Sequence, residues 1–368
     1  MKINSFKNKK VLITGNTGFK GSWLTCWLLD LGADIYGISK DIPTNPSMFK
    51  SLDLEKKITH FYEDITDYKS IKKLINKINP DFVFHMAAQP IVVTSYTNPL
   101  ETINSNVLGT ANILESLRVI NKKCIAVIIT SDKCYDNVEW EWGYKETDAL
   151  GGKDIYSGSK GAAEIIFNSY FHSYFKDQKK YKTRLVSVRA GNVIGGGDWA
   201  DYRIVPDCIK AWVNNDSVEI RSPESTRPWQ HVLEPLSGYL AIASELEENS
   251  ELNGHSFNFG PTEKYNKSVV DLLKELSNYW QLTNKAFKLS NEKIKFHEAG
   301  LLKLNCDKAL FHLKWLPTLD SHKLIEFTSK WYNEFYYSEK NMFEYTMQQI
   351  KEYNQIAKNN NIRWSTKN

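Results

Sequence analysis

The sequence lacks the features that mark a nucleic-acid-binding, membrane or secreted protein. Its 47 basic and 43 acidic residues leave a net charge of +4, and no tract of Lys and Arg is longer than a pair or so. Such an evenly charged chain gives no positive support for nucleic-acid binding. No apolar run approaches the length of a membrane span, and residues 1–7 carry no apolar signal-peptide core. We therefore expect a cytoplasmic protein with no membrane or nucleic-acid partner.

Cysteine is also scarce. The chain has five cysteines in 368 residues, without the spacing of metal ligands: Cys26, Cys124, Cys134, Cys208 and Cys306. This pattern predicts free thiols and no metal site. The composition, 42% hydrophobic and 24% charged, is typical of a globular protein, and the length fits one large domain or two closely packed ones.

The first half of the chain alternates between two patterns. Short, continuously apolar runs are separated by stretches with helical spacing, notably 106–120 and 156–175. The runs that predict strands lie at 11–14, 33–38, 82–86, 126–130 and 185–188. Continuous apolar strands between helices predict an α/β protein of the Rossmann type, with a doubly wound parallel sheet buried on both faces. Ligands of such sheets bind at the carboxyl ends of the strands.

After Gly195 this alternation stops. We expect a first domain over 1–190 and a smaller mixed α/β lobe with C-terminal helices over 191–368. One late strand near 256–260 is expected to return to the first sheet. The tail from 338 to 368 is polar with a helical pattern, and its Lys- and Asn-rich end is expected to fray.

A glycine-rich segment, residues 15–21, joins the first strand to the first helix. Glycines there permit a tight turn, close approach of the backbone to a pyrophosphate and close helix packing, and the helix N-terminus favours negative charge. The spacing alone would also fit a purely structural turn, but the strand-turn-helix context favours a dinucleotide site. The residues expected to bind the cofactor here are Gly15, Thr17, Gly18, Phe19 and Gly21.

Further cofactor contacts follow the next strands. Asp41 lies at the distance at which an acidic residue holds an adenosine ribose, which favours NAD. Lys40 could instead meet a 2′-phosphate and so favour NADP. Asp64 and Ile65 are expected to flank the adenine, although a surface turn would look similar. The segment Ala87-Ala88-Gln89 ends the fourth strand and leaves room for the nicotinamide ribose.

Two short motifs carry the chemistry. Tyr156 and Lys160 lie one helical turn apart, where the ammonium is expected to lower the pKa of the phenol. The phenol could then accept a proton near neutral pH. Ser131, Asp132 and Lys133 follow the apolar run at 126–129. Oxidation of an alcohol needs only Ser131, Tyr156 and Lys160, so the extra acid and base require an explanation. Alone, Asp132-Lys133 would be a salt-bridged turn, and Tyr-x-x-x-Lys an ordinary amphipathic pattern.

Together these blocks resemble the extended short-chain dehydrogenase/reductase family of nucleotide-sugar enzymes. The resemblance covers about residues 8–320, and its blocks are 14–24, 87–90, 130–135, 151–152, 156–161, 189–199 and 227–232. The most specific are Gly-Asn-Val-Ile-Gly-Gly-Gly-Asp-Trp at 191–199 and Arg-Pro-Trp-Gln-His-Val at 227–232. The departures from the family pattern are Asn16, Ala149, Ile155 and Gly158, none of which must react.

Within this family the chain is similar to the 4,6-dehydratases that act on CDP-glucose. The resemblance implies NAD as cofactor and the nucleotide sugar as substrate, with a 4-keto-6-deoxy product used for surface polysaccharide. Tyr156, with Lys160 and Ser131, would take the proton of the 4-hydroxyl as hydride leaves C4. Related dehydratases then use an Asp-Glu pair to eliminate water across C5 and C6. Here Lys133 replaces the glutamate as base, which requires a neutral amine, and Asp132 is the acid at O6.

The resemblance also implies how the substrate is held. The residues expected to bind it, besides Ser131, are Asn192, Arg203, Arg227 and Gln230. Both arginines have the fork geometry that suits a pyrophosphate, although either could be a structural ion pair. Asn192 could be a turn residue between glycines. Trp199 and Trp229 fit a pocket wall or the core almost equally.

Alternative functions remain at this point. A 4-epimerase or a simple reductase on the same scaffold would not need Asp132 and Lys133. A non-catalytic regulator would tolerate the loss of Tyr156 or Lys160. Apolar stripes on the helices at 106–120 and 156–175 predict a homodimer, with a tetramer also open.

Overall fold

A seven-stranded parallel sheet lies at the centre of the protein. The computed structural model describes residues 5–220, 222–261, 266–282, 285–289 and 301–366. In sheet order the strands are β11 (Ser256–Phe259), β6 (Thr183–Ala190), β5 (Cys124–Ile129), β4 (Phe82–His85), β1 (Lys10–Thr14), β2 (Asp34–Ser39) and β3 (Thr59–Tyr62). Every neighbouring pair is parallel, which confirms the predicted doubly wound sheet.

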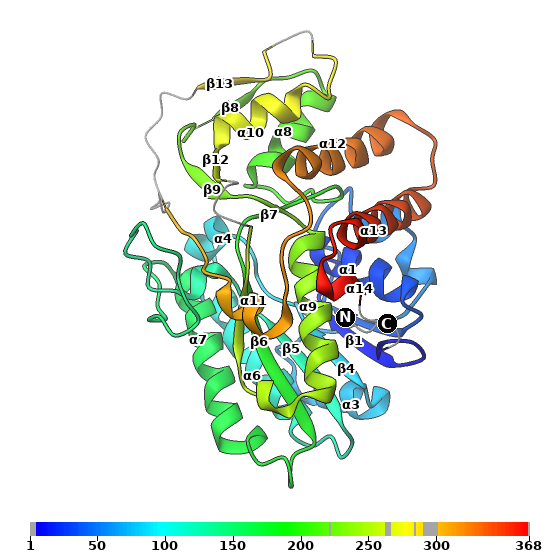
Figure 1. Ribbon diagram of the computed structural model, residues 1–368, viewed down its shortest axis with the longest axis vertical. Helices are drawn as coiled ribbons and strands as arrows, with labels where there is room; N and C mark the ends of the chain where they lie inside the picture. The colour runs from blue at the N-terminus through cyan, green and yellow to red at the C-terminus, as the bar shows by residue number, and fades with distance from the viewer. Residues whose placement is uncertain (1–4, 221, 262–265, 283–284, 290–300, 367–368) are drawn as a thin grey trace.

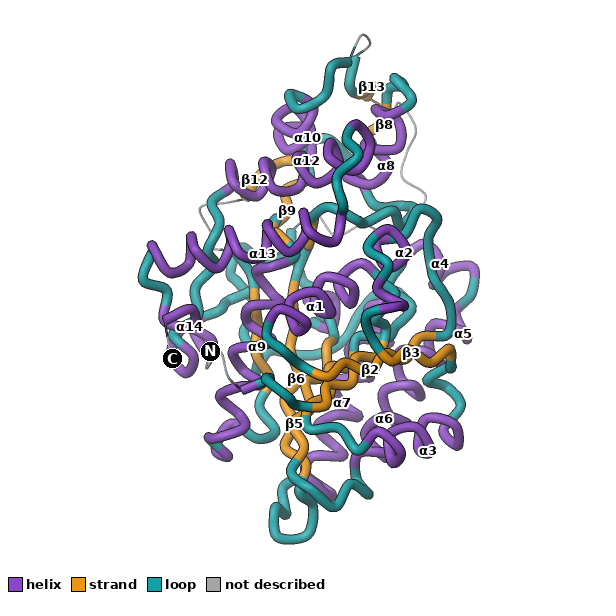
Figure 2. The backbone as a smooth tube through the Cα atoms, turned by 90° about the vertical axis from the view of Figure 1, so that its right-hand side faces the viewer, coloured by secondary structure: helices purple, strands orange, loops and turns teal. Residues whose placement is uncertain are grey.

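Helices cover both faces because the strands carry apolar side chains on both. In β1, Val11 and Ile13 join the core beneath α1 (Phe19–Asp30) and α9 (Leu233–Glu248), whereas Leu12 joins the opposite core. This alternation is the period of two that a strand imposes. The opposite core lies under α3 (Tyr68–Ile78), α6 (Gly109–Leu117) and α7 (Ile155–Tyr170). Figure 2 shows α1 and α9 on one side of the sheet and α3 and α6 on the other.

The strand order reverses between β1 and β4, and this reversal opens a crevice at their carboxyl ends. Gly15 follows β1 with φ +76°, and a Cβ there would lie 2.7 Å from the backbone nitrogen of Ala87, which follows β4. Only glycine permits this close approach. The glycine-rich turn is therefore locked against the strand end where a ligand can enter.

The part of the chain after 190 contributes to both lobes. β11 is an edge strand of the sheet, and Figure 1 shows α9 beside the sheet, while α8 (Ile204–Val213) and α10 (Val269–Ser277) form the upper lobe. Three two-stranded sheets accompany them: β7 (Val193–Ile194) with β10 (Gln230–His231), β9 (Thr226–Pro228) with β12 (Asn266–Ser268), and β8 (Val218–Ile220) with β13 (Phe287–Leu289). Other short elements are α2 (Met48–Ser51), η2 (Leu54–Lys56), α4 (Val92–Thr97), α5 (Pro99–Ile103), η6 (Ser250–Leu252) and α11 (Asp307–Leu313).

Three helices close the described part of the chain; the last two follow the helical pattern expected over 338–368, and the Lys- and Asn-rich end that was expected to fray carries a helix as far as Thr366. They are α12 (Ser321–Tyr337), α13 (Met342–Asn359) and α14 (Arg363–Thr366). Tyr353 of α13 stacks on Trp364 of α14 with ring centroids 5.6 Å apart, and both meet Trp27 of α1 edge-on. All three rings are buried. Burial of these large rings docks the end of the chain on the first domain.

The helices predicted at 106–120 and 156–175 are present, each joined to a π-helical turn. The turn η3 (Asn104–Leu108) precedes α6, and η5 (Phe171–Phe175) follows α7. Over the described residues, no helix combines the length and the apolar character needed to cross a membrane.

Candidate active site

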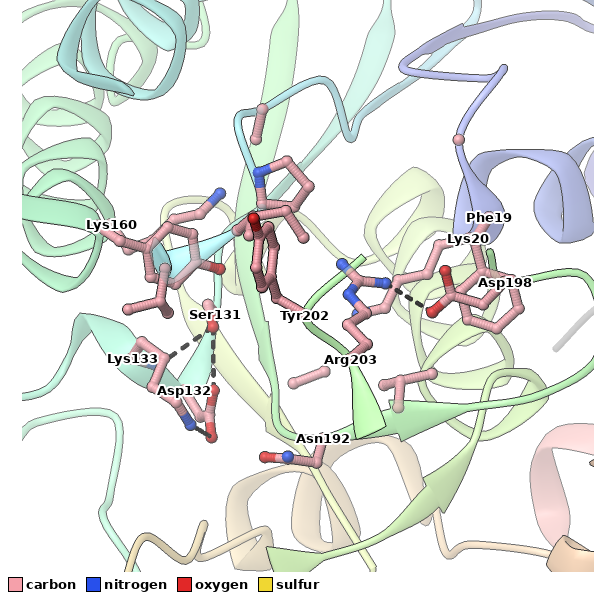
Figure 3. A pocket seen from close by; sticks show the side chains of 18 of the residues that line it. Phe19, Lys20, Ser131, Asp132, Lys133, Lys160, Asn192, Asp198, Tyr202 and Arg203 are labelled. Atoms are coloured by element: carbon pink, nitrogen blue, oxygen red, sulfur yellow. Dashed lines mark hydrogen bonds and ion pairs between the residues drawn. The ribbon is translucent and has the colours of Figure 1, made fainter. Parts of the chain in front are cut away.

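A cavity of about 770 Å³ opens at the carboxyl ends of the central strands, between the sheet and the second lobe. Its walls include the glycine-rich turn, the ends of β4, β5 and β6, the start of α7, and the segment that leads into α8. The size is that of a typical small-molecule site. Figure 3 shows Ser131, Asp132 and Lys133 on one side and Lys20, Asp198 and Arg203 on another.

The glycine-rich turn leaves its backbone open to the cavity. Near Gly18 a Cβ would meet only the Gly15 carbonyl oxygen at 3.4 Å, whereas at Gly21 it would lie 2.2 Å from that same oxygen. Gly21 thus packs the helix tightly, and Gly18 leaves free space beside the N-terminus of α1. Such a helix N-terminus favours a phosphate, so the residues present fit the diphosphate of a dinucleotide.

Asp41, Asp64 and Ile65, which were expected to meet the adenosine, line one cavity. Thr17 fixes Asp41 by donating a hydrogen bond of 2.7 Å from Oγ1 to its carbonyl oxygen. Lys40 Nζ donates to Glu101 Oε1 at 2.9 Å. The lysine that could have met a 2′-phosphate therefore already has a carboxylate partner.

Two glutamines expected at the site have side chains that point elsewhere. Ala87 and Ala88 line the cavity, but Gln89 does not; its Nε2 donates to Thr102 Oγ1 at 2.8 Å. Gln230 is also absent from the cavity wall, is buried, and donates from Nε2 to the Phe259 carbonyl at 3.1 Å. The Gln89 amide thus holds the Thr102 side chain and accepts from the Ile91 backbone N–H, and the Gln230 amide holds a backbone carbonyl, so neither faces a ligand.

Ser131, Asp132 and Lys133 form a compact hydrogen-bonded unit in the cavity wall. Ser131 caps the 3-10 turn η4 (Asp132–Cys134), accepting from the Lys133 backbone N–H at 3.2 Å. Its hydroxyl donates to Asp132 Oδ1 at 3.0 Å, and Lys133 Nζ donates to Asp132 Oδ2 at 2.8 Å. The Asp132 side chain is 5% exposed and that of Lys133 is 28% exposed. The salt-bridged turn is therefore real, and it lies inside the cavity.

Tyr156 and Lys160 lie on the cavity side of α7, and both are buried. Asp154 caps the helix by accepting from the Ser157 backbone N–H at 2.9 Å. Burial raises the pKa of Tyr156 to about 12, opposed by its hydrogen bond with Ser131. This is opposite to the expected lowering by Lys160. The Lys160 ammonium lies 5.9 Å from the phenol ring centroid, and burial lowers its own pKa to about 8.

A buried ion pair lies behind these residues. Arg189 of β6 donates to Glu164 of α7 at 2.8 Å, and the two side chains are 1% and 0% exposed. Thr130 donates to the other carboxylate oxygen of Glu164, and Ser187 donates to the shared one at 2.8 Å. Because Thr130 immediately precedes Ser131, this network fixes the end of β5 against α7.

The opposite wall carries cations. Arg203, Arg227 and Asn192 line the cavity. Arg203 Nη1 donates to Asp198 Oδ2 at 2.8 Å, so the structural ion pair considered for Arg203 exists, although its side chain stays 33% exposed. Asp198 is held in turn by Tyr332 of α12, whose hydroxyl accepts from the Asp198 backbone N–H at 3.1 Å.

The two tryptophans have different positions. Trp199 is buried in an aromatic cluster with Trp331 and Phe335 of α12, at centroid distances of 5.7 and 4.8 Å. Trp229 lines the cavity and donates from Nε1 to the Lys267 carbonyl at 3.2 Å. Only Trp229 can therefore contact a ligand.

The side chains that line the cavity without having been singled out from the sequence include Lys20, Asp198 and Tyr202. Lys20 and Asp198 lie within the motif blocks at 14–24 and 189–199. The sequence therefore marks these two residues, but it does not show that their side chains face the cavity. Tyr202 has φ +63°, a left-handed conformation that is uncommon for a bulky residue and carries no sequence signal.

The fold and the site together define a class. A doubly wound sheet with a glycine-rich turn after β1, and Ser131, Tyr156 and Lys160 around one cavity, is the arrangement of a short-chain dehydrogenase/reductase. The chain belongs to the GDP-mannose 4,6 dehydratase family, whose model matches residues 12–328.

Individual relatives agree with this assignment. The chain is 43% identical over 331 residues to the CDP-glucose 4,6-dehydratase of Salmonella typhimurium, covering 89% of this chain and 92% of the relative. It is 25% identical to the CDP-paratose 2-epimerase of Salmonella typhi, covering 87% and 99%. The solved UDP-glucuronic acid 4-epimerase from Bacillus cereus, in complex with UDP-glucuronic acid and NAD, shares the fold with a TM-score of 0.73, 22% identity and coverage of 89% and 99%.

Proposed function

We propose that this protein is an NAD-dependent hydro-lyase that converts CDP-glucose to CDP-4-dehydro-6-deoxyglucose and water. The observation that carries the proposal is the Asp132–Lys133 ion pair, which adds an acid and a base to the cavity that also holds Ser131 and Tyr156. The identity of 43% to a CDP-glucose 4,6-dehydratase supports both the reaction and the substrate.

NAD fits the cofactor half of the cavity. The free space at Gly18 and the N-terminus of α1 would hold its diphosphate, and Asp41 the adenosine ribose. The pairing of Lys40 with Glu101 supports NAD over NADP. Bound there, NAD would supply the hydride chemistry of the reaction, from C4 of the sugar and back to C6.

Tyr156 is the proposed base of the oxidation. Its phenolate would accept the proton of the 4-hydroxyl, with the Ser131 hydroxyl orienting both oxygens. Burial alone opposes this role, because it raises the pKa of Tyr156 to about 12. Arg203 acts in the other direction by lowering the pKa of the phenol. Lys160, whose ammonium lies 5.9 Å from the phenol ring centroid, would hold the ribose and support the phenolate.

The Asp132–Lys133 pair is the proposed acid and base of the elimination. Transfer of one proton from the Lys133 ammonium to the Asp132 carboxylate, across their 2.8 Å hydrogen bond, gives a neutral amine and a carboxylic acid. The amine can then remove the C5 proton, while the acid protonates O6 as it leaves as water. In water this transfer is unfavourable by about six pKa units between the two residue types. Exclusion of water by the substrate favours the neutral form.

The competing functions explain less of the site. A 4-epimerase or a reductase uses Ser131, Tyr156 and Lys160, and leaves the Asp132–Lys133 pair without a role. A non-catalytic binding protein would need none of the five side chains. The proposed elimination uses all of them.

We also propose a cytoplasmic homodimer. Leu108 of η3 and Ile165 of α7 are 53% and 54% exposed, and Leu100 of α5 is 73% exposed, which leaves an apolar surface on the helices for a second copy. All five cysteines are free, as in proteins of a reducing compartment. The product would be a precursor of deoxysugars in surface polysaccharide.

The test is incubation of the purified protein with CDP-glucose, dTDP-glucose, UDP-glucose and GDP-mannose, each followed by mass spectrometry. We expect the CDP sugar alone to lose the mass of one water. A changed sugar of unchanged mass would instead support the epimerase. No reaction with any donor would overturn the dehydratase proposal.

A further inference from the structure

Lys20 is a cation in the cavity wall that the proposed reaction does not use. It lies on the first turn of α1, within the glycine-rich segment, and its side chain faces the cavity. It makes no hydrogen bond or ion pair within the part of the chain that the structure describes. Figure 3 shows Lys20 on the side of the cavity that holds Asp198 and Arg203.

The charges around Lys20 identify the part of the cavity that its ammonium faces. Besides burial, the groups with the largest influence on its pKa are two cations, Arg203 and Lys160, and two carboxylates, Asp132 and Asp198. Asp41 and Asp64, which are expected to meet the adenosine, are not among them. Asp198 already binds Arg203 at 2.8 Å, and Asp132 already binds Lys133. Neither carboxylate is therefore free to neutralise Lys20.

Two cations that share one wall of a partly buried cavity repel each other unless an anion lies between them. Burial and the Arg203 guanidinium lower the pKa of Lys20 to about 8, which reflects this unfavourable state. Arg203 has further N–H groups beyond the Nη1 that meets Asp198, since a guanidinium carries five. A diphosphate would supply the missing charge and enough acceptor oxygens for both side chains.

We infer that Lys20 and Arg203 bind one diphosphate between them, and that it is the diphosphate of the nucleotide sugar. This inference rests on the proposed function. The diphosphate of the dinucleotide would be held by the backbone at the N-terminus of α1, beside Gly18. The Lys20 side chain lies on the side of the cavity that holds Asp198 and Arg203, and the charge of Asp132 reaches its ammonium, so it belongs to the half of the cavity where the sugar must react.

Lys20 also connects the substrate site with the cofactor site. Lys20 belongs to the turn that would hold the cofactor, so a nucleotide sugar bound to its ammonium also stabilises that turn.

The wild-type affinity for the diphosphate should fall as the pH rises above about 8, because Lys20 then loses its charge. A Lys20→Arg variant stays charged and should show no such fall.

The experiment uses the NAD-loaded protein and measures binding of CDP and CMP by isothermal titration calorimetry. Lys20→Met should weaken CDP binding roughly tenfold to hundredfold and CMP binding less, while Lys20→Arg should restore most of the CDP affinity. The matched control is Lys210→Met, which removes the same charge from a lysine of α8 that pairs with Asp201 outside the cavity wall. An unchanged CDP affinity in Lys20→Met, or an equal loss in the control, would overturn the inference.

Two further readouts separate the possible failures. If Lys20→Met loses NAD and saturating NAD restores CDP binding, the lysine serves the diphosphate of the cofactor and the inference is wrong. If the wild-type protein binds UDP or GDP in preference to CDP, cytosine is the wrong nucleotide base for the substrate. The affinity of the Lys20 variants for the preferred nucleoside diphosphate is then measured, and the same tenfold to hundredfold loss of affinity is expected for Lys20→Met.

Discussion

The Lys133 ammonium lies 2.8 Å from Asp132 Oδ2, and the two residues are neighbours in the chain. The 3-10 turn that begins at Asp132 brings both side chains to the same wall of the cavity, and Ser131 holds the second carboxylate oxygen at 3.0 Å. One proton shift within this pair would create an acid and a base together. The pair is therefore expected to act as a unit, and the loss of either member should stop the elimination.

Removing the Tyr156 hydroxyl should stop the first step. Tyr156→Phe leaves no group to accept the proton of the 4-hydroxyl, so kcat should fall roughly 10²- to 10⁴-fold. The measurement is the steady-state rate of product formation. Tyr170→Phe, at the far end of the same helix, is the control and should keep the wild-type rate. Comparable activity of the two variants would show that Tyr156 is not the base.

Tyr332 is expected to act on the substrate at a distance. Its hydroxyl holds the backbone of Asp198, whose carboxylate holds Arg203. Tyr332→Phe should leave a buried N–H without its acceptor and loosen Arg203, at a cost of about 1–3 kcal/mol. We expect KM for the nucleotide sugar to rise roughly tenfold with kcat nearly unchanged. A fall in kcat at constant KM would contradict this positioning role.

The Glu164–Arg189 pair should contribute strongly to stability. Because both side chains are fully buried, Glu164→Ala leaves an uncompensated guanidinium and should cost about 3–5 kcal/mol of unfolding free energy. Urea denaturation measures the loss. Replacing both residues by methionine should cost less than Glu164→Ala alone, and a double variant that is worse than the single would rule out the buried-charge explanation.

The buried Glu234 carboxyl is expected to make the unfolding free energy of the protein depend on pH. Burial raises its pKa to about 7, although the backbone N–H groups of Leu319 and Thr318 oppose the shift. The folded state therefore binds a proton more tightly than the unfolded state. Its contribution is fully present below about pH 4.5 and is lost as the pH rises through about 7, by about 3 kcal/mol at most. Thermal unfolding of Glu234→Gln should show a smaller fall across this range, and an unchanged slope would contradict the assignment.

Much of the fold could be predicted because it depends on local patterns. Continuous apolar strands and helical spacing placed β1, β4, β5 and β6, and the carboxyl ends of those strands bring Ser131 and Asn192 to one cavity. The glycine turn at Gly15 could be predicted for the same reason, because its left-handed backbone depends on only a few neighbouring residues.

The remaining features depend on contacts that are distant in sequence. Arg203 and its partner Asp198 lie in one short segment of the sequence. Tyr332, which holds the backbone of Asp198, comes from a helix more than a hundred residues later. Gln230 turns away because the Phe259 carbonyl accepts its amide. The raised pKa of Tyr156 arises from burial by several elements, which the Tyr-x-x-x-Lys spacing does not encode.

The central claim, that Asp132 and Lys133 carry out the elimination, is tested most directly by Lys133→Met in a single-turnover reaction with CDP-glucose. NADH absorbance reports the oxidation at C4, and mass spectrometry reports the loss of water. Lys145→Met, an exposed lysine outside the cavity wall, is the matched control and should behave as wild type. We predict that Lys133→Met accumulates NADH and releases no dehydrated sugar. Dehydration at the wild-type rate would contradict the account.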